Sequence, residues 1–395
     1  MEANGQARAR PLREPHRVRS AGVTGNPTSL QSLPRQPAGV PWPTHEWPRR
    51  DPEGDPSVAH HRLSEALSAP FGDDAPPELG LTLAVLVVHR GAIVAEAYGP
   101  GYVSEFERLD GKEAQPVDAD TPLISWSMAK SMLHAAIGIA AREGRIDVDT
   151  PPPVPEWSGP DDPRRTITWA HLLHMASGLA WIEDYVDGEG SDVIEMLFGA
   201  GATDMAGFAA SFPPAAQPDT RFVYSSGTSN ILARALQTVL GLEGDADGMR
   251  SFLATELFEP LGMTSADPRF DPAGTFTASS YVYATARDFA RFGLLYLRGG
   301  IWDGRTIVTP EWVDDARTPI PLDTLSYCGY GSHWWTHPDE LGTFGCHGYE
   351  GQRITCVPAR DLVVVRLGKT TAPDDDLAEA PVDRYVDEII ACFGA

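Results

Sequence analysis

Residues 124–142 read ISWSMAKSMLHAAIGIAAR, and Ser127 and Lys130 stand three positions apart near the start of this run. The pattern predicts a helix over 127–142, and residues three apart share a helix face, so the Lys130 amine can reach the Ser127 hydroxyl. Apolar neighbours nearly all round predict that the helix is buried. Burial favours a neutral lysine, which can act as the base for a serine nucleophile. The S-x-x-K pattern is weak by itself, because three lysines give about a one-in-five chance of meeting it at random.

The overall composition narrows the functional classes. The 395 residues are 42% hydrophobic, which is enough for one large enzyme domain or two subdomains. Acidic residues outnumber basic ones 55 to 31 and the formal net charge is −24, so neither nucleic acid nor a membrane surface is expected as a partner. A polar, arginine-rich N-terminus and the lack of an 18-residue apolar run favour a cytoplasmic protein. The cysteines are widely spaced and predict buried thiols: Cys328, Cys346, Cys356 and Cys392.

The chain divides into an arm and a larger domain. Residues 1–75 are rich in proline, arginine and glycine and predict an extended or partly disordered arm. The later part of this arm, with Trp42 and Trp47, is expected to lie against the body. Residues 76–395 form the predicted main domain. Its expected strands are 81–89 and 92–98, joined by a tight turn at Arg90-Gly91, and later 352–357 and 361–367.

Helices are expected between these strands. They cover residues 127–142, 169–175, 205–212, 228–240, 249–261 and 285–297, a shorter stretch after Pro310, and 382–392. This order predicts an α+β fold whose antiparallel sheet draws strands from both chain ends and is flanked by helices. The sheet lobe is expected to take about 76–120 and 270–395. A mainly helical subdomain is expected over about 121–269.

Two further segments carry candidate chemistry. Tyr224 stands in FVYSS (222–226), directly before a predicted helix, where its phenol can share the proton taken from Ser127. The segment CHGYEGQ (346–352) leads into a strand, and glycines at a strand edge let a substrate carbonyl approach backbone N–H donors. Taken alone, such a tyrosine is more often a packing residue and such glycines a simple turn.

In this order, the three segments resemble the serine β-lactamase and penicillin-binding protein superfamily, in which S-x-x-K is followed by Tyr-x-Asn and Lys-Thr-Gly. The likeness is strongest to the class C-like esterases and amidases, in particular the 6-aminohexanoate-dimer hydrolase group, and covers roughly residues 80–390. Further stretches that carry it are SWSMAKS (125–131), EGRID (143–147), HLLHMASG (171–178), EDY (183–185), ATARDFAR (284–291) and Trp334-Trp335.

Two motifs depart from the superfamily pattern. Cys346 stands in place of the lysine of Lys-Thr-Gly, with His347 in place of its threonine, and Ser226 replaces the asparagine of Tyr-x-Asn. In β-lactamases that lysine serves carboxylate recognition. The departure therefore favours ester or amide hydrolysis over antibiotic hydrolysis.

The resemblance implies a serine hydrolase that cleaves a carboxylic ester or short linear amide through an acyl-enzyme on Ser127. Lys130 and Tyr224 would act as general base and acid, and the N–H groups of Ser127 and Tyr349 would form the oxyanion hole. The expected substrate-binding residues are Tyr185, Trp181, His347 and Gly348. Two alternatives stay open: a β-lactamase or D-alanyl peptidase, and a catalytically silent binding protein on the same scaffold.

No cofactor and no metal are expected. His171 and His174 have a spacing that could suit a metal ion, but the sequence places no acidic third ligand beside them. The expected partner is a small-molecule ester or amide. The sequence leaves the oligomeric state open, with a homodimer among the options.

Overall fold

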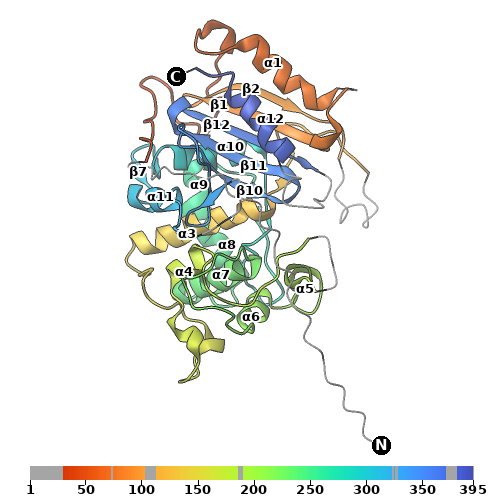
Figure 1. Ribbon diagram of the computed structural model, residues 1–395. Coiled ribbons are helices and arrows are strands. Elements are labelled where there is room, and N and C mark those ends of the chain that lie inside the picture. Colours follow the sequence, from red (N-terminus) through yellow and green to blue (C-terminus); the bar gives the residue numbers. More distant parts are fainter. Residues whose placement is uncertain are drawn as a thin grey trace, which may run out of the picture.

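Two lobes make up the molecule, a sheet covered by helices and a group of helices at its lower end (Figure 1). The computed structural model describes residues 30–394 except 73, 103–112, 186–189, 323, 325–327 and 371–379. The sheet has the strand order β2-β1-β12-β11-β10-β9-β8, and each neighbouring pair is antiparallel. These strands are β1 Leu81–His89, β2 Ala92–Tyr98, β8 Gly329–Tyr330, β9 Trp335–Thr336, β10 Phe344–Gly348, β11 Gln352–Val357 and β12 Leu362–Lys369. The expected α+β fold, with an antiparallel sheet drawn from both chain ends, is thereby confirmed.

The sheet is apolar on both faces because helices cover both. Val85 and Val87 of β1 pack in one core with α12 (Ala380–Ile390) and α1 (His60–Ser68). Leu86 and Val88, which point the other way, pack in a second core with α10 (Ala286–Leu297). A strand buried on both faces needs an unbroken apolar run, and LTLAVLVV is such a run. At the hairpin turn Arg90 and Gly91 both have positive φ, 50° and 75°, as a type I′ turn requires.

The helices of the helical lobe follow the predicted order, with α5 (Asp192–Phe198) as an additional helix that the sequence pattern did not predict. The helices are α3 Ala129–Arg142, α4 Trp169–Leu173, α5 Asp192–Phe198, α6 Met205–Ala210, α7 Ser226–Leu240, α8 Ala246–Leu253, α9 Glu259–Leu261 and, nearer the sheet, α11 Pro310–Ala316. Short 3-10 or π-helical turns are η1 Pro52–Gly54, η2 Ala69–Phe71, η3 Pro77–Leu79, η4 Trp126–Met128, η5 Pro155–Trp157, η6 Pro163–Thr166, η7 Ala254–Phe258, η8 Tyr349–Gly351 and η9 Pro358–Arg360. Every residue from Ala129 to Ala140 is buried, as the apolar run in the sequence predicts.

Two small sheets complete the framework. β3 (Leu123–Ile124) pairs with β5 (Val282–Ala284), which also pairs with β4 (Asp267–Pro268). β6 (Ile301–Trp302) and β7 (Arg305–Thr306) form a hairpin. The β3–β5 pairing ties the segment directly before Ser127 to the segment directly after Ser280, and so helps to build the candidate site.

The N-terminal arm lies along the body. Trp42 packs on Trp302 with ring centroids 5.0 Å apart, and Trp47 Nε1 donates to the Arg287 carbonyl at 3.3 Å. The composition predicts an extended arm through residue 75, whereas residues 60–68 form helix α1. Only Leu63 is buried in that helix, so its apolar pattern is too weak to stand out in the sequence.

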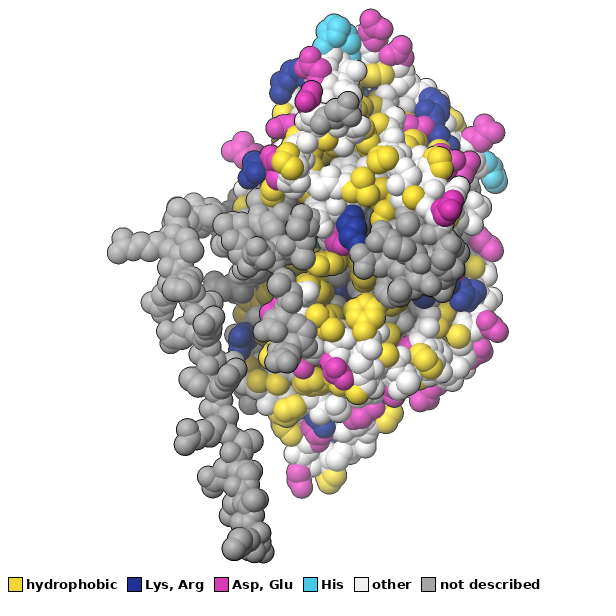
Figure 2. Space-filling view, turned by 90° about the vertical axis from the view of Figure 1, so that its right-hand side faces the viewer, with side chains coloured by type: hydrophobic (Ala, Val, Ile, Leu, Met, Phe, Trp, Pro, Cys, Tyr) yellow, Lys and Arg dark blue, Asp and Glu magenta, His cyan; other side chains and the backbone are white. Residues whose placement is uncertain are grey.

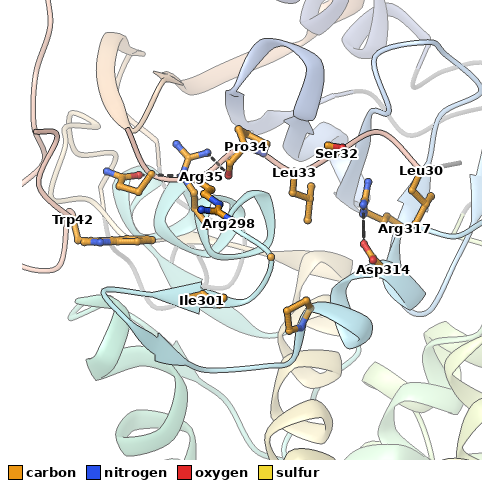
Figure 3. A pocket seen from close by; sticks show the side chains of 13 residues that line it. Leu30, Ser32, Leu33, Pro34, Arg35, Trp42, Arg298, Ile301, Asp314 and Arg317 are labelled. Carbon is orange, nitrogen blue, oxygen red and sulfur yellow. Dashed lines mark hydrogen bonds and ion pairs between the residues drawn. The ribbon is translucent and has the colours of Figure 1, made fainter. Parts of the chain in front are cut away.

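Arginine side chains fasten the arm across a cavity of about 660 Å³ (Figure 3). Arg298 donates to Gln36 Oε1 at 3.0 Å and pairs with Asp361 at 2.6 Å. Arg317 donates to the Gln31 carbonyl at 2.6 Å. The arm side of the cavity is lined by Leu30, Leu33, Pro34 and Trp42, and the body side by Ile301 and Pro310, among others. Hydrogen bonds from arginine side chains thus hold the arm on the body, next to a cavity with a partly apolar lining.

The surface fits the acidic composition. Acidic side chains are scattered around the rim of the face shown in Figure 2, and hydrophobic side chains gather across its middle. On this face the negative charge therefore lies mostly toward the rim. Within the described ranges, no helix has both the length and the apolar character needed to cross a bilayer. All four cysteine side chains are buried, as the sequence predicts.

Candidate active site

Ser127 and Lys130 meet as the i, i+3 spacing predicts. Ser127 lies in η4 and Lys130 in the first turn of α3, and Lys130 Nζ is 2.9 Å from Ser127 Oγ. Trp126, directly before the serine, has a φ of +43°, a conformation that costs a non-glycine residue energy. Such strain is common at functional sites, where neighbouring structure holds it in place.

Lys130 is a buried amine with three hydrogen-bonding partners. Besides Ser127, it lies 3.0 Å from Ser226 Oγ and 2.9 Å from the Ser279 carbonyl oxygen, and its side chain is 1% exposed. Burial lowers the pKa of Lys130 to about 8, although the nearby Glu183 carboxylate opposes this shift. A substantial fraction of the amine is therefore neutral near pH 8. Ser226 contacts the lysine from the third position of the Tyr224-Ser225-Ser226 motif, where the superfamily pattern has asparagine.

The ring of Tyr224 lies beside the Lys130 amine. Lys130 Nζ is 4.9 Å from the ring centroid, and Trp335 stacks on the same ring at 5.3 Å and 26°. Tyr330 meets the ring edge-on at 6.1 Å. An aromatic face stabilises a cation, so the ring favours the ammonium that forms when Lys130 takes up a proton.

The glycine segment forms a tight turn against the backbone directly before Ser127. A side chain at Gly348 would place its Cβ 2.3 Å from the Ser125 carbonyl oxygen, so glycine is needed for this close approach. Glu350 has a φ of +63°, and its carboxylate accepts a hydrogen bond from Trp126 Nε1 at 3.4 Å. This hydrogen bond links the residue before Ser127 to the residue after Tyr349, and so ties together the two segments that carry the candidate oxyanion donors.

Residues 181–185 bring three side chains to the same place: Trp181, Glu183 and Tyr185. Tyr185 donates to Glu183 Oε1 at 2.5 Å, and its ring lies 4.9 Å from that of Tyr349. Trp181 donates through Nε1 to Glu183 Oε2 at 2.5 Å and lies against Gly227. Tyr185 and Trp181 therefore stand next to the serine–lysine pair and share one carboxylate as partner.

His347 occupies a different setting from the other predicted substrate-binding residues. Its side chain is buried and stacks on Trp335 at 5.6 Å and 18°, and it lies 5.4 Å from His337. Burial holds the pKa of His347 well below its usual range, so the ring is neutral. Cys346, in the position of the missing lysine, is buried as well, and burial raises its pKa, which leaves an uncharged thiol there.

Three residues with direct roles in the site geometry were not assigned from the sequence. Glu183 accepts from both Ser226 and Tyr185, and the Ser279 carbonyl accepts from Lys130. Asn230 Oδ1 accepts from the Ser279 backbone N–H at 3.2 Å. The acidic pair Glu183-Asp184 directly after the apolar run GLAWI (178–182) was the available signal for Glu183. The loop around Ser279 has no periodic pattern, so its position follows only from the fold.

Known proteins match both this sequence and this fold. The model of the Beta-lactamase family matches residues 79–388. The 6-aminohexanoate-dimer hydrolase of Paenarthrobacter ureafaciens is 27% identical over 403 residues, covering 91% of this chain and 92% of that protein. A penicillin-binding protein homologue from Caulobacter crescentus has a TM-score of 0.63 at 18% identity, covering 84% of this chain and 97% of that chain. A family VIII carboxylesterase has a TM-score of 0.62 at 15% identity, covering 86% and 98%. The chain belongs to the Beta-lactamase family of serine hydrolases.

Proposed function

We propose that this protein hydrolyses a carboxylic ester or a short linear amide through an acyl-enzyme on Ser127. The observation that carries the proposal is the contact of Ser127 with Lys130, a buried amine whose pKa is about 8. A base works best when its pKa lies near the working pH, and this amine meets that condition. Relatives named as an amide hydrolase and a carboxylesterase support both substrate classes.

The reaction proceeds in two halves. Lys130 takes the hydroxyl proton as Ser127 Oγ bonds to the carbonyl carbon, and the N–H groups of Ser127 and Tyr349 stabilise the oxyanion. The bond to the alcohol or amine then breaks, and the proton passes from Lys130, with Tyr224, to that leaving group. In the second half a water molecule gives its proton to Lys130 and attacks the acyl carbon. The acid leaves and Ser127 regains its proton.

The Cys346 position separates this proposal from antibiotic hydrolysis. A β-lactam carries a carboxylate, and a neutral buried thiol offers it no charge at the position where the superfamily pattern has lysine. Neutral esters and amides do not need that charge. We therefore expect nitrocefin turnover to be slower than turnover of a simple p-nitrophenyl ester, and a nitrocefin rate that rivals the ester rate would favour a β-lactamase instead.

A fluorophosphonate probe tests the nucleophile. Intact-protein mass should show one phosphonyl adduct on the wild type, none on Ser127→Ala, and an undiminished adduct on the control Ser158→Ala, whose serine is exposed and is not among the site residues. An unlabelled wild type, or full labelling of Ser127→Ala, would contradict the assignment of Ser127 as the nucleophile. Labelling without turnover of any ester or amide would favour the alternative hypothesis of a catalytically silent binding protein.

A further inference from the structure

The Glu183 carboxylate receives four hydrogen bonds, two on each oxygen. Oε2 accepts from Trp181 Nε1 at 2.5 Å and from the Ser226 backbone N–H at 2.9 Å. Oε1 accepts from the hydroxyls of Tyr185 and Ser226, each at 2.5 Å. The backbone contact satisfies a first-turn N–H of α7, where the helix dipole also favours negative charge. Glu183 is therefore held in place from the helix end and from its own loop.

This arrangement fixes the direction of the hydrogen bond between Ser226 and Lys130. An ionised carboxylate can only accept, so the Ser226 hydroxyl must spend its single proton on Glu183. Ser226 Oγ can then only accept from Lys130 Nζ, 3.0 Å away. The Ser279 carbonyl, 2.9 Å from the same nitrogen, is also an acceptor only.

A neutral lysine amine has two protons and one lone pair. With both protons given to Ser226 and Ser279, the remaining tetrahedral position, which holds the lone pair, faces Ser127 Oγ at 2.9 Å. We infer that Glu183 is a positioning residue, which acts through the Ser226 hydroxyl to point the lone pair of neutral Lys130 at the nucleophile. The inference rests on the proposed function and adds a residue to its machinery.

Without the carboxylate, the Ser226 hydroxyl is free to turn. It can then donate to the lysine lone pair, and one amine proton will point at Ser127 Oγ instead. A lysine in that orientation donates to the nucleophile and cannot accept its proton. The nucleophile and the base would still be 2.9 Å apart, but the pair would be unproductive.

Among the residues that the structure describes, three charged or titratable groups act on or lie against the amine. Glu183 comes from the loop before α5, the Tyr224 ring from the segment before α7, and His333 from the turn between β8 and β9. Burial lowers the pKa of His333 to about 3, so it stays neutral at the pH values of an activity assay. Within the described part of the chain, Glu183 is therefore the charge whose loss should change the protonation of Lys130.

The test is the pH profile of kcat/KM for Glu183→Gln with a p-nitrophenyl ester. We expect the plateau to fall about 100-fold, the lower end of what a general base contributes. We also expect the acid-side midpoint to move to lower pH, because removing a negative charge lowers the pKa of a neighbouring lysine. An unchanged midpoint together with a wild-type plateau would overturn the inference. If the fluorophosphonate probe did not label the wild type, the proposed function itself would be contradicted.

A double-mutant cycle separates positioning from support of the loop. In a Ser226→Ala background the carboxylate has no hydroxyl to orient, so adding Glu183→Gln should change kcat/KM less than about fivefold. A full additional loss there would mean that Glu183 only supports the loop, and would overturn the inference. Glu156→Gln is the matched control: it makes the same substitution in a carboxylate that pairs with Arg234 of α7 and is not among the site residues, and it should cost less than about fivefold, the size of one ordinary hydrogen bond.

Ser226→Ala also carries the test alone if Glu183→Gln does not fold. It keeps the carboxylate on the α7 backbone N–H and removes only the oriented hydroxyl. We expect kcat to fall about 100-fold with a smaller change in KM, because the base is affected rather than substrate binding. A kcat within about threefold of wild type would contradict the role given to Glu183.

Discussion

Lys130 and Arg366 are both buried cationic side chains, one beside the proposed nucleophile Ser127 and the other behind the glycine turn. Lys130 is 1% exposed and Arg366 0%. Lys130 bonds to two hydroxyls and one carbonyl, whereas Arg366 donates to the carbonyls of Glu350, Gly351 and Leu79 at 2.7 to 3.1 Å. The two side chains are about equally buried and both have polar partners, yet one is a lysine and the other an arginine.

The difference lies in whether the cation can lose its proton. Burial brings the pKa of Lys130 to about 8, while an arginine stays charged at any pH that a protein tolerates. A lysine in such a place can exchange protons with Ser127. An arginine can only hold carbonyl groups, and here it holds the turn that carries Tyr349. Burial alone therefore does not separate the proposed base from a structural cation in this molecule; the residue type and its partners distinguish them.

The largest effect on activity is expected when the cation that can lose its proton, Lys130, is replaced. Lys130→Met fills a similar volume without a charge, and we expect kcat/KM for a p-nitrophenyl ester to fall about 1000-fold because the base is gone. Burying a charge is costly, so its removal should lower the thermal midpoint little. Steady-state kinetics and circular dichroism melting measure the two effects. A variant with more than a tenth of wild-type activity would show that another group is the base.

The opposite result is expected where the cation is structural. Arg366→Met leaves the Gly351 and Leu79 carbonyls without this donor, which should lower the free energy of unfolding by about 3 kcal/mol in urea titrations. The turn loosens, so kcat/KM should fall about tenfold, less than the loss when an oxyanion donor is removed outright. Unchanged stability with activity reduced as far as in Lys130→Met would mean that Arg366 takes part in the chemistry.

The two regions also differ in how far the sequence predicted them. The strands at 81–89, 92–98 and 352–357 coincide with β1, β2 and β11, because apolar runs beside glycine turns are local signals. The Ser127–Lys130 contact follows from helix spacing alone. Contacts made across the fold carry no such signal: Ser279 reaches Lys130 from 149 residues away, and Arg366 reaches Leu79 from 287. Short elements such as β8 and β9, two residues each, are too brief for a pattern.

The pH dependence of wild type and Arg366→Met gives the finest distinction between the two cations. In the wild type, kcat/KM should rise through a midpoint near pH 8, because the ammonium form of Lys130 is inactive and predominates below its pKa. At pH 7 about a tenth of the amine is neutral, so the rate should be about tenfold below its plateau. In Arg366→Met the plateau should fall while the midpoint stays, since burial and Glu183 set the pKa of Lys130 and Arg366 does not contribute. A flat wild-type profile from pH 6.5 to 9.5 would contradict lysine as the base, and a shifted midpoint in Arg366→Met would show that the glycine turn and the lysine site are coupled.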